Sequence, residues 1–266
     1  MKSTHFDDPV AAYDRLAAHY AGISRRRAPY LERVEREVIW RIPARSRSIL
    51  DIGAGDGTRA LRIAAGSGIR RIVLLEPSTE MCSIANSQLE SGGCAHLTEP
   101  IEVWPVRAES LTSDSVSERF DVITCLWNVL GHIAAEKREP ALRAVCQLLS
   151  PYGKFFIDIN HRYNLRAYGL IPTCGRWLRD HLYPTESNGD VRSNWNVGQS
   201  SITTYGHVFT DREIMHLAAA AGLELEQRIV IDYEVGRVER LAYQGNLLYV
   251  FRRSSRIDSS SAPQTS

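Results

Sequence analysis

A glycine-rich loop is the part of the sequence with the clearest chemical meaning. It reads Asp51-Ile52-Gly53-Ala54-Gly55-Asp56-Gly57-Thr58 and stands where a predicted strand passes into a predicted helix. Because glycine has no Cβ, a backbone with glycine at alternate positions can turn sharply and approach a ligand closely. The loop therefore predicts a ligand site, although taken alone it is also compatible with a tight turn that binds nothing.

An acidic residue follows the loop at a distance that suits a nucleoside site. Glu76 ends the next predicted strand, about 20 residues further on. Its carboxylate can accept two hydrogen bonds from the hydroxyls of a ribose. The glycine spacing is Gly-x-Gly-x-Gly rather than the Gly-x-Gly-x-x-Gly of dinucleotide-binding enzymes, which disfavours an NAD-dependent oxidoreductase.

The elements around the loop alternate between short apolar runs and amphipathic segments, which predicts an α/β fold. Strands that are apolar throughout are typical of a parallel sheet covered on both faces by helices. We predict strands over 48–52, 71–75, 101–106, 120–126 and 154–159, with helices over 57–65, 79–89 and 136–149. After a helix over 211–221, strands over 223–233 and 247–251 predict an antiparallel pair at one edge. The result is a Rossmann-like, seven-stranded, mostly parallel sheet with an antiparallel last strand.

Two regions lie outside this alternation. Helical periodicity extends over 9–41 in two pieces, interrupted at Gly22, and we interpret residues 1–45 as an N-terminal helical lid. Residues 161–210 are rich in Tyr and Trp, and we interpret them as a substrate cap inserted into a domain of residues 46–253. Residues 254–266 are rich in serine and are predicted to be a disordered tail.

Composition narrows the class of function. The chain has 266 residues, of which 44% are hydrophobic, so global disorder is excluded and one sizeable domain fits. A formal net charge of +1 argues against a protein whose main function is to bind nucleic acid or an anionic membrane. Five scattered cysteines without zinc spacing fit reduced thiols. With no signal core and no apolar run that spans a bilayer, we expect a cytoplasmic protein, monomer or homodimer, without a membrane partner.

At this point the sequence resembles the class I S-adenosylmethionine-dependent methyltransferases. The segments that carry the resemblance are ILDIGAGDG (49–57), LLEPS (74–78), FDVI (120–123), LLSPYGK (148–154), HVFT (207–210) and AGL (221–223). Together they cover roughly residues 45–253. The resemblance implies an enzyme that uses S-adenosyl-L-methionine as methyl donor and releases S-adenosyl-L-homocysteine.

The resemblance also implies which residues bind the donor. Glu76 would hold the ribose hydroxyls, Met81 would pack near the adenine, and Asp51 would orient the loop or meet the donor's ammonium group. Where many relatives begin the adenine-edge segment with an acid, this chain has Arg107, which cannot accept a bond from the adenine amino group. The Ala108 backbone and Glu109 are therefore expected there, although Glu109 also fits a solvated loop acid. The donor-binding residues implied are Asp51, Gly53, Ala54, Gly55, Glu76, Pro77, Met81, Ala108, Glu109, Leu126 and Tyr20.

The segment after the fourth predicted strand bears on the acceptor. It lacks the Asp/Asn-Pro-Pro-Tyr/Phe motif of methyltransferases that act on DNA bases, and it looks like the Asn-x-Leu-x-His pattern of small-molecule methyltransferases. Asn128 and His132 are four residues apart, so one helical turn would place both on a face toward the donor. We interpret His132 as a general base or an acceptor-orienting residue, or else as the cap of a short helix.

Further acceptor candidates follow the fifth predicted strand and lie in the first helix. Asn160, His161 and Tyr163 stand at the ligand-binding edge of an α/β sheet, unless they only hydrogen-bond the strand end. Tyr13 and Tyr20 resemble the lid tyrosines of small-molecule relatives, with lid packing as the alternative. The catalytic candidates are His132, Asn128 and His161, and the acceptor-binding candidates are Tyr13, Trp127, Asn160 and Tyr163.

These interpretations combine into one expected function with stated alternatives. We expect methyl transfer to a nitrogen or oxygen of a small, aromatic or heterocyclic metabolite. The alternatives are a tRNA or rRNA methyltransferase, for which the near-neutral charge gives no support, and a non-catalytic protein that binds the donor. No metal is expected, because a site at Asp158 would need a further acid where Asn128 stands.

Overall fold

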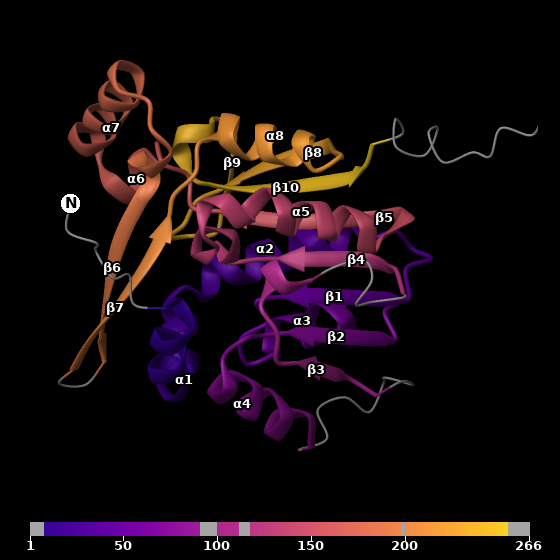
Figure 1. The fold of residues 1–266 in the computed structure, drawn as a ribbon. Helices are drawn as coiled ribbons and strands as arrows, with labels where there is room; N and C mark the ends of the chain where they lie inside the picture. The colour runs from indigo at the N-terminus through magenta and orange to yellow at the C-terminus, as the bar shows by residue number, and fades with distance from the viewer. Residues whose placement is uncertain (1–7, 91–99, 112–117, 198–199, 255–266) are drawn as a thin grey trace, which may run out of the picture.

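The computed structural model describes residues 8–90, 100–111, 118–197 and 200–254 (Figure 1). Predictions that concern Cys94, the first seven residues of the expected lid and the expected tail beyond Ser254 lie outside the described residues.

One mixed sheet forms the centre of the described structure. Its strands are β1 (Ser48–Ile52), β2 (Arg71–Leu75), β3 (Glu102–Trp104), β4 (Phe120–Cys125), β5 (Leu149–Ile159), β8 (Leu223–Ile231), β9 (Val238–Glu239) and β10 (Asn246–Arg253). Their order is β3-β2-β1-β4-β5-β10-β8-β9. The first five pair in parallel, whereas β10 runs antiparallel to both β5 and β8. The chain leaves β1 toward β2 on one side and reaches β4 on the other, and α/β sheets bind ligands at the carboxyl ends of such strands.

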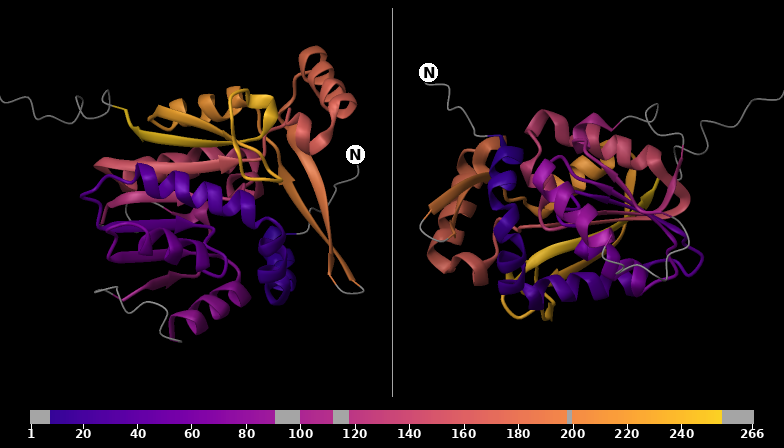
Figure 2. Two further views of the ribbon diagram at one scale, coloured as in Figure 1. Left: turned by 180° about the vertical axis from the view of Figure 1, so that it is seen from behind. Right: turned by 90° about the horizontal axis from the view of Figure 1, so that it is seen from below.

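Helices cover both faces of this sheet (Figures 1 and 2). On one face lie α5 (Ala135–Leu148) and α8 (Asp211–Ala220), and on the other lie α2 (Ala28–Arg41) and α3 (Thr58–Ala65). Because side chains alternate along a strand, Leu50 packs in the core beneath α5 while its neighbour Ile49 packs beneath α2. Helix α4 (Thr79–Glu90) follows β2. The described residues stop at the end of this helix and resume at residue 100, shortly before β3.

The remaining elements stand beside the carboxyl ends of the parallel strands. They are α1 (Pro9–Arg26), α6 (Leu165–Tyr168), α7 (Leu170–Leu182) and a separate hairpin of β6 (Asp190–Val197) and β7 (Ser200–His207). Figure 2 shows α1 lying alongside this hairpin. Leu16 and Ile23 of α1 pack against Ile202 of β7, so the first helix and the hairpin share a small core of their own.

The structure confirms the Rossmann-like α/β fold and corrects three details. The sheet has eight strands rather than seven, because the two-residue β9 adds to the edge at β8. The antiparallel pair predicted at the edge is β8 with β10, but β10 also pairs with β5 along its length. The N-terminal helices separate at Arg27 rather than Gly22, because Gly22 lies within α1 and Pro29 starts the next helix in its first turn.

Candidate active site

The glycine loop joins β1 to α3 with three residues in the left-handed region. Gly53, Gly55 and Gly57 have φ angles of 67°, 59° and 77°, which side chains with a Cβ rarely adopt. A Cβ on Gly53 would lie 2.5 Å from a methyl group of Val129, and one on Gly55 would lie 3.2 Å from the hydroxyl of Tyr20. The glycines are therefore needed both for the turn and for the close approach of these two neighbours.

Glu76 lies directly against the loop. One carboxylate oxygen accepts a hydrogen bond of 2.8 Å from the Gly55 backbone N–H, and the other accepts one of 3.0 Å from the Ser78 N–H. The side chain is buried, and this burial raises the pKa of Glu76. The residue thus sits where the sequence places a ribose-binding acid, with its orientation fixed by two backbone groups.

Asp51 holds the base of the loop rather than its surface. It is fully buried, and it accepts hydrogen bonds from the Thr124 hydroxyl at 2.6 Å and from the Arg59 guanidinium at 3.3 Å. Arg59 also donates to the Gly53 carbonyl at 3.3 Å. Of the two roles predicted for Asp51, these contacts are those of a residue that orients the loop.

A cavity of about 740 Å³, open to solvent, lies over the loop and Glu76. Its lining includes eight of the predicted donor-binding residues, namely Gly53, Gly55, Glu76, Pro77, Ala108, Glu109, Leu126 and Tyr20. Asp51, Ala54 and Met81 do not line it. Met81 is completely buried behind the cavity wall, where its backbone N–H bonds the Ser78 hydroxyl, and Ala54 faces a neighbouring hollow under α1. We call this space the first cavity.

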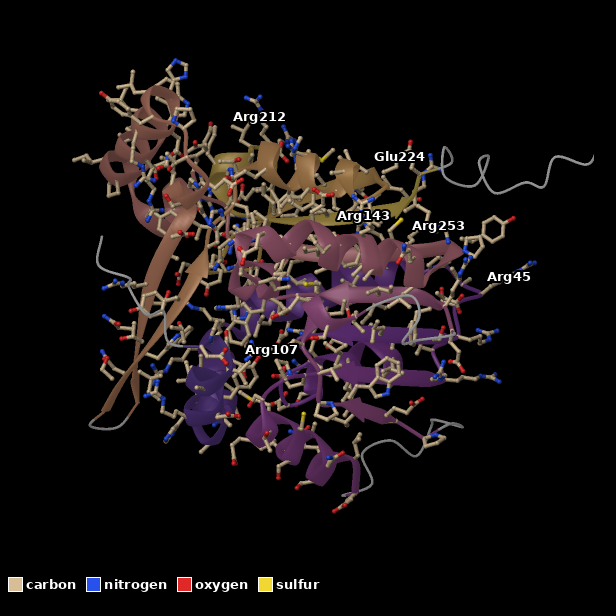
Figure 3. All side chains as sticks on the ribbon, viewed as in Figure 1. Arg45, Arg107, Arg143, Arg212, Glu224 and Arg253 are labelled. Carbon is tan, nitrogen blue, oxygen red and sulfur yellow. The ribbon has the colours of Figure 1, made fainter. Side chains whose placement is uncertain are left out.

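We did not predict from the sequence that Pro9, Val10 and Arg107 line the first cavity. Pro9 and Val10, at the start of α1, line it. Arg107 lines it too, and it forms an ion pair with Asp8, the cap of α1 (Figure 3). Asp14 accepts a bond of 2.6 Å from the Ser78 hydroxyl, which ties α1 to the start of α4. The available signal was Arg107 itself, which stands where many relatives carry an acid. Because its guanidinium cannot accept a bond from adenine, it is available to pair with a carboxylate of the lid.

The turn after β4 is held in an unusual backbone conformation. Trp127 and Asn128 have φ angles of 65° and 59°, a region that costs energy for residues with side chains and that is common at functional sites. The Trp127 N–H donates to Asp158, which also accepts a bond of 2.5 Å from Tyr30. The turn therefore rests on a buried carboxylate, and burial raises the pKa of Asp158.

Asn128 secures the same turn with its side chain. Its Oδ1 accepts a bond of 2.9 Å from the Asn160 backbone N–H, and its Nδ2 donates to the His207 carbonyl at 3.1 Å. These bonds join the ends of β4, β5 and β7. The amide is buried and both of its ends are engaged, so Asn128 fixes the position of the turn.

His132 ends the short 3₁₀ helix η2 (Val129–His132) and has both ring nitrogens in contact. Nδ1 lies 2.8 Å from the Tyr205 carbonyl, and Nε2 lies 3.0 Å from the Tyr13 hydroxyl. Because a carbonyl only accepts, Nδ1 carries the proton and Nε2 has a free lone pair that accepts from Tyr13. Burial lowers the pKa of His132, which favours this neutral form.

A second cavity of about 690 Å³ adjoins the first. It is lined by Tyr13, Leu16, Tyr20, Ile23, Trp127, Asn128, His132, Asn160, Val191, Ser193, Trp195, Thr204, Gly206 and Tyr233. Four of these residues, Tyr13, Tyr20, Trp127 and His132, also line the first cavity, so they form the boundary between the two spaces. The hairpin lies within the segment 161–210 predicted as a substrate cap, but none of its residues was predicted individually, and Tyr233 was not predicted as a site residue.

Two of the predicted catalytic and acceptor-binding residues lie in neither cavity. His161 is buried, its Nδ1 lies 2.9 Å from the Ala242 carbonyl, and burial lowers its pKa to about 4. Tyr163 donates to Asp180 at 2.7 Å. The prediction assumed that the chain beyond β5 stays at the sheet edge, whereas it turns away to begin α6. Asn160, the last of this group, does line the second cavity.

Two further properties concern the described ranges as a whole. No three His, Cys, Asp or Glu side chains within them gather as a group that could hold a metal ion. Among the helices of these ranges, none has both the length and the apolar character that crossing a bilayer requires.

A family model described as a methyltransferase domain matches residues 49–153, the segment that carries the glycine loop, Glu76 and the turn after β4. Over these residues the chain is similar to known methyltransferase domains. No curated protein matches the chain.

Solved structures share the fold of this chain at low sequence identity. An S-adenosylmethionine-dependent methyltransferase from Clostridium acetobutylicum has a TM-score of 0.63 and 15% identity, over 91% of this chain and 99% of that one. The glycopeptide N-methyltransferase MtfA, complexed with sinefungin, has a TM-score of 0.60 and 13% identity, over 83% and 85%. A putative methyltransferase in complex with the Haloferax volcanii Trm112 activator has a TM-score of 0.62 and 15% sequence identity, over 92% of this chain and 97% of that one.

Proposed function

We propose that this methyltransferase transfers a methyl group from S-adenosylmethionine to a nitrogen or oxygen of a small aromatic or heterocyclic molecule. The observation that carries the proposal is the pair of adjoining cavities with four boundary residues in common. The donor occupies the first cavity and the acceptor occupies the second, so that the methyl group crosses the boundary.

The residues of the first cavity fit the donor. Glu76 presents a carboxylate at the end of β2, where its remaining lone pairs can accept from ribose hydroxyls while the Gly55 and Ser78 amides hold it in place. Ala108 and Glu109 line the same space on the η1 turn (Ala108–Ser110) and are positioned to contact the adenine. When bound, the donor supplies an electrophilic methyl group on a sulfonium. The chain's task is then alignment and the exclusion of water.

The second cavity fits a planar acceptor of modest size. Its wall contains the rings of Trp127, Trp195 and Tyr233. Ring faces of this kind stack on flat molecules. His132 stands at the boundary with an Nε2 lone pair that now accepts from Tyr13, where it can orient an acceptor or receive its proton.

The elements around both cavities act as a lid and a cap in this proposal. Helix α1 belongs to the segment 1–45 that we propose as the lid, and it closes the first cavity through the pairs of Asp8 with Arg107 and of Asp14 with Ser78. Hairpin β6–β7 belongs to the segment 161–210 that we propose as the cap, and it supplies one wall of the second cavity. The parallel sheet within 46–253 carries the donor site.

Product analysis with labelled donor tests the proposal. The purified chain is incubated with methyl-tritiated S-adenosylmethionine and, separately, with a panel of aromatic and heterocyclic metabolites, total tRNA and rRNA, and protein extract. Transfer to members of the metabolite panel is expected. Transfer to RNA or protein alone would contradict the proposal, and donor binding without transfer to any class would point to a non-catalytic donor-binding protein.

A further inference from the structure

The wall of the second cavity is uncharged apart from the titratable ring of His132. Among the described residues that line it there is no Asp, Glu, Lys or Arg. The first cavity differs, because Glu76, Arg107 and Glu109 all line it. A carboxylate or phosphate on the acceptor would lose its hydration in the second cavity without gaining an ion pair, which is strongly unfavourable. The wall therefore selects an acceptor without a formal charge.

The tautomer of His132 provides the second constraint. Tyr205, on β7 of the hairpin, fixes the proton on Nδ1, so the Nε2 lone pair faces the boundary between the cavities. The group in contact with this lone pair is the Tyr13 hydroxyl, and burial raises the pKa of Tyr13, so it stays protonated and donates. An acceptor with its own O–H can take the place of Tyr13 as the donor to Nε2. The chain thus holds a proton acceptor where the reacting atom has to lie.

We propose that the acceptor is an uncharged aromatic hydroxyl compound and that His132 Nε2 removes its hydroxyl proton during O-methylation. This inference rests on the function proposed above. The acceptor O–H bond breaks and its proton passes to Nε2, giving an imidazolium. The oxygen forms a bond to the methyl carbon while the carbon–sulfur bond breaks, and the electron pair of that bond remains on sulfur. The imidazolium later releases its proton to water.

A base held in this way distinguishes a hydroxyl from an amine. A neutral amine attacks with its own lone pair and loses its proton afterwards, so it needs no base beforehand, whereas a hydroxyl is a weak nucleophile until its proton is removed. The amine N–H is also a weaker donor to Nε2. An acceptor nitrogen would therefore gain little from the fixed tautomer of His132.

Matched acceptors test the inference. Three ring systems, naphthalene, quinoline and indole, are each offered as the hydroxyl compound, the amino compound and the hydroxyl compound with an added carboxylate, with saturating labelled donor. Within each ring system that reacts, the hydroxyl compound is expected to exceed the carboxylated one in kcat/KM by about 100-fold and the amine by about 10-fold. A higher kcat/KM for the amine or for the carboxylated compound than for the hydroxyl compound would overturn the inference and leave the proposed function standing.

The remaining outcomes separate the two proposals. Transfer to RNA or protein with none of the nine compounds methylated would overturn the proposed function as well. For the hydroxyl compound, kcat should fall at acidic pH as His132 becomes protonated, and His132→Gln should abolish this limb. His216→Gln, on the exposed face of α8, is the control and should keep the wild-type profile. A profile that is unchanged in His132→Gln would overturn the role of the base.

Discussion

The two cavities differ in how the chain builds them. Most of the first is made by segments that follow β1, β2, β3 and β4, so neighbouring strands of one sheet deliver its glycine loop, Glu76 and the η1 turn, and α1 supplies the rest of the wall. The second takes its wall from α1, the turn after β4, the end of β5, hairpin β6–β7 and Tyr233 after β8. Charge follows the same division, because charged groups line the first cavity and neutral groups line the second. The proposed donor site thus adjoins a proposed acceptor site that is assembled from distant segments, and substitutions should affect one function without the other.

A substitution at His132 is expected to give the largest difference between the effect on catalysis and the effect on donor binding. His132→Gln removes the lone pair on Nε2, so kcat with a hydroxyl acceptor should fall by about 10²–10⁴-fold while the Kd of the donor stays nearly unchanged. Stopped-flow or steady-state kinetics together with calorimetry of donor binding measure both quantities. The exposed His216 gives the matched control, His216→Gln. A large loss of donor affinity at unchanged kcat would reverse the assignment of the two cavities.

His161 lies outside both cavities and should affect stability instead. Its folded pKa of about 4 lies below the value near 6.5 of an unfolded histidine, so the unfolded chain binds more protons between these values. Burial is the main cause, and the nearby Asp211, Arg228 and Arg162 oppose one another. Stability should therefore be complete above about pH 6.5 and should fall by about 3 kcal/mol as the pH drops toward 4.

Denaturant unfolding of the wild type and of His161→Asn across this pH range measures the effect. The variant should be less stable at neutral pH and should show a smaller loss on acidification, with kcat near the wild-type value at pH 7.5. A strong loss of kcat in a variant that remains folded would return His161 to the catalytic role expected from the sequence.

A substitution of Glu76, in the first cavity, should have the opposite effect and weaken donor binding more than it changes the acceptor KM. Glu76→Ala removes a carboxylate that is placed to accept from the ribose, so donor affinity should weaken by about 1–3 kcal/mol, measured by calorimetry. Acceptor KM should change little. Glu80→Ala, at an exposed position in the first turn of α4, is the control. Unchanged affinity in Glu76→Ala would count against the placement of the ribose.

The smallest effect is expected from Tyr13→Phe. The change removes one neutral hydrogen bond to His132 Nε2 but keeps the ring, so kcat/KM should change by about 1 kcal/mol, or roughly fivefold. Tyr243→Phe, at a partly exposed ring after β9, is the control. A loss as large as that in His132→Gln would mean that the Tyr13 hydroxyl itself handles the acceptor proton.

The sequence predicted the sheet and most of the first cavity because both depend on local patterns. Gly53, Gly55 and Glu76 are recognisable where a strand ends, and strand alternation follows from runs of apolar residues. The second cavity depends on contacts between residues far apart in the chain, such as Tyr13 with His132 and Asn128 with the His207 carbonyl. No spacing rule connects these pairs. His161 was predicted from its place at the end of a strand, and in the structure it lies outside both cavities, with its ring against the Ala242 carbonyl.

A crystal structure with S-adenosylhomocysteine tests the central claim most directly. The account predicts that the ribose hydroxyls bond Glu76, that the adenine lies beside Ala108, and that the sulfur faces the boundary formed by Tyr13, Trp127 and His132. The product bound in another place, or bound in the first cavity with its sulfur turned away from the second, would contradict it.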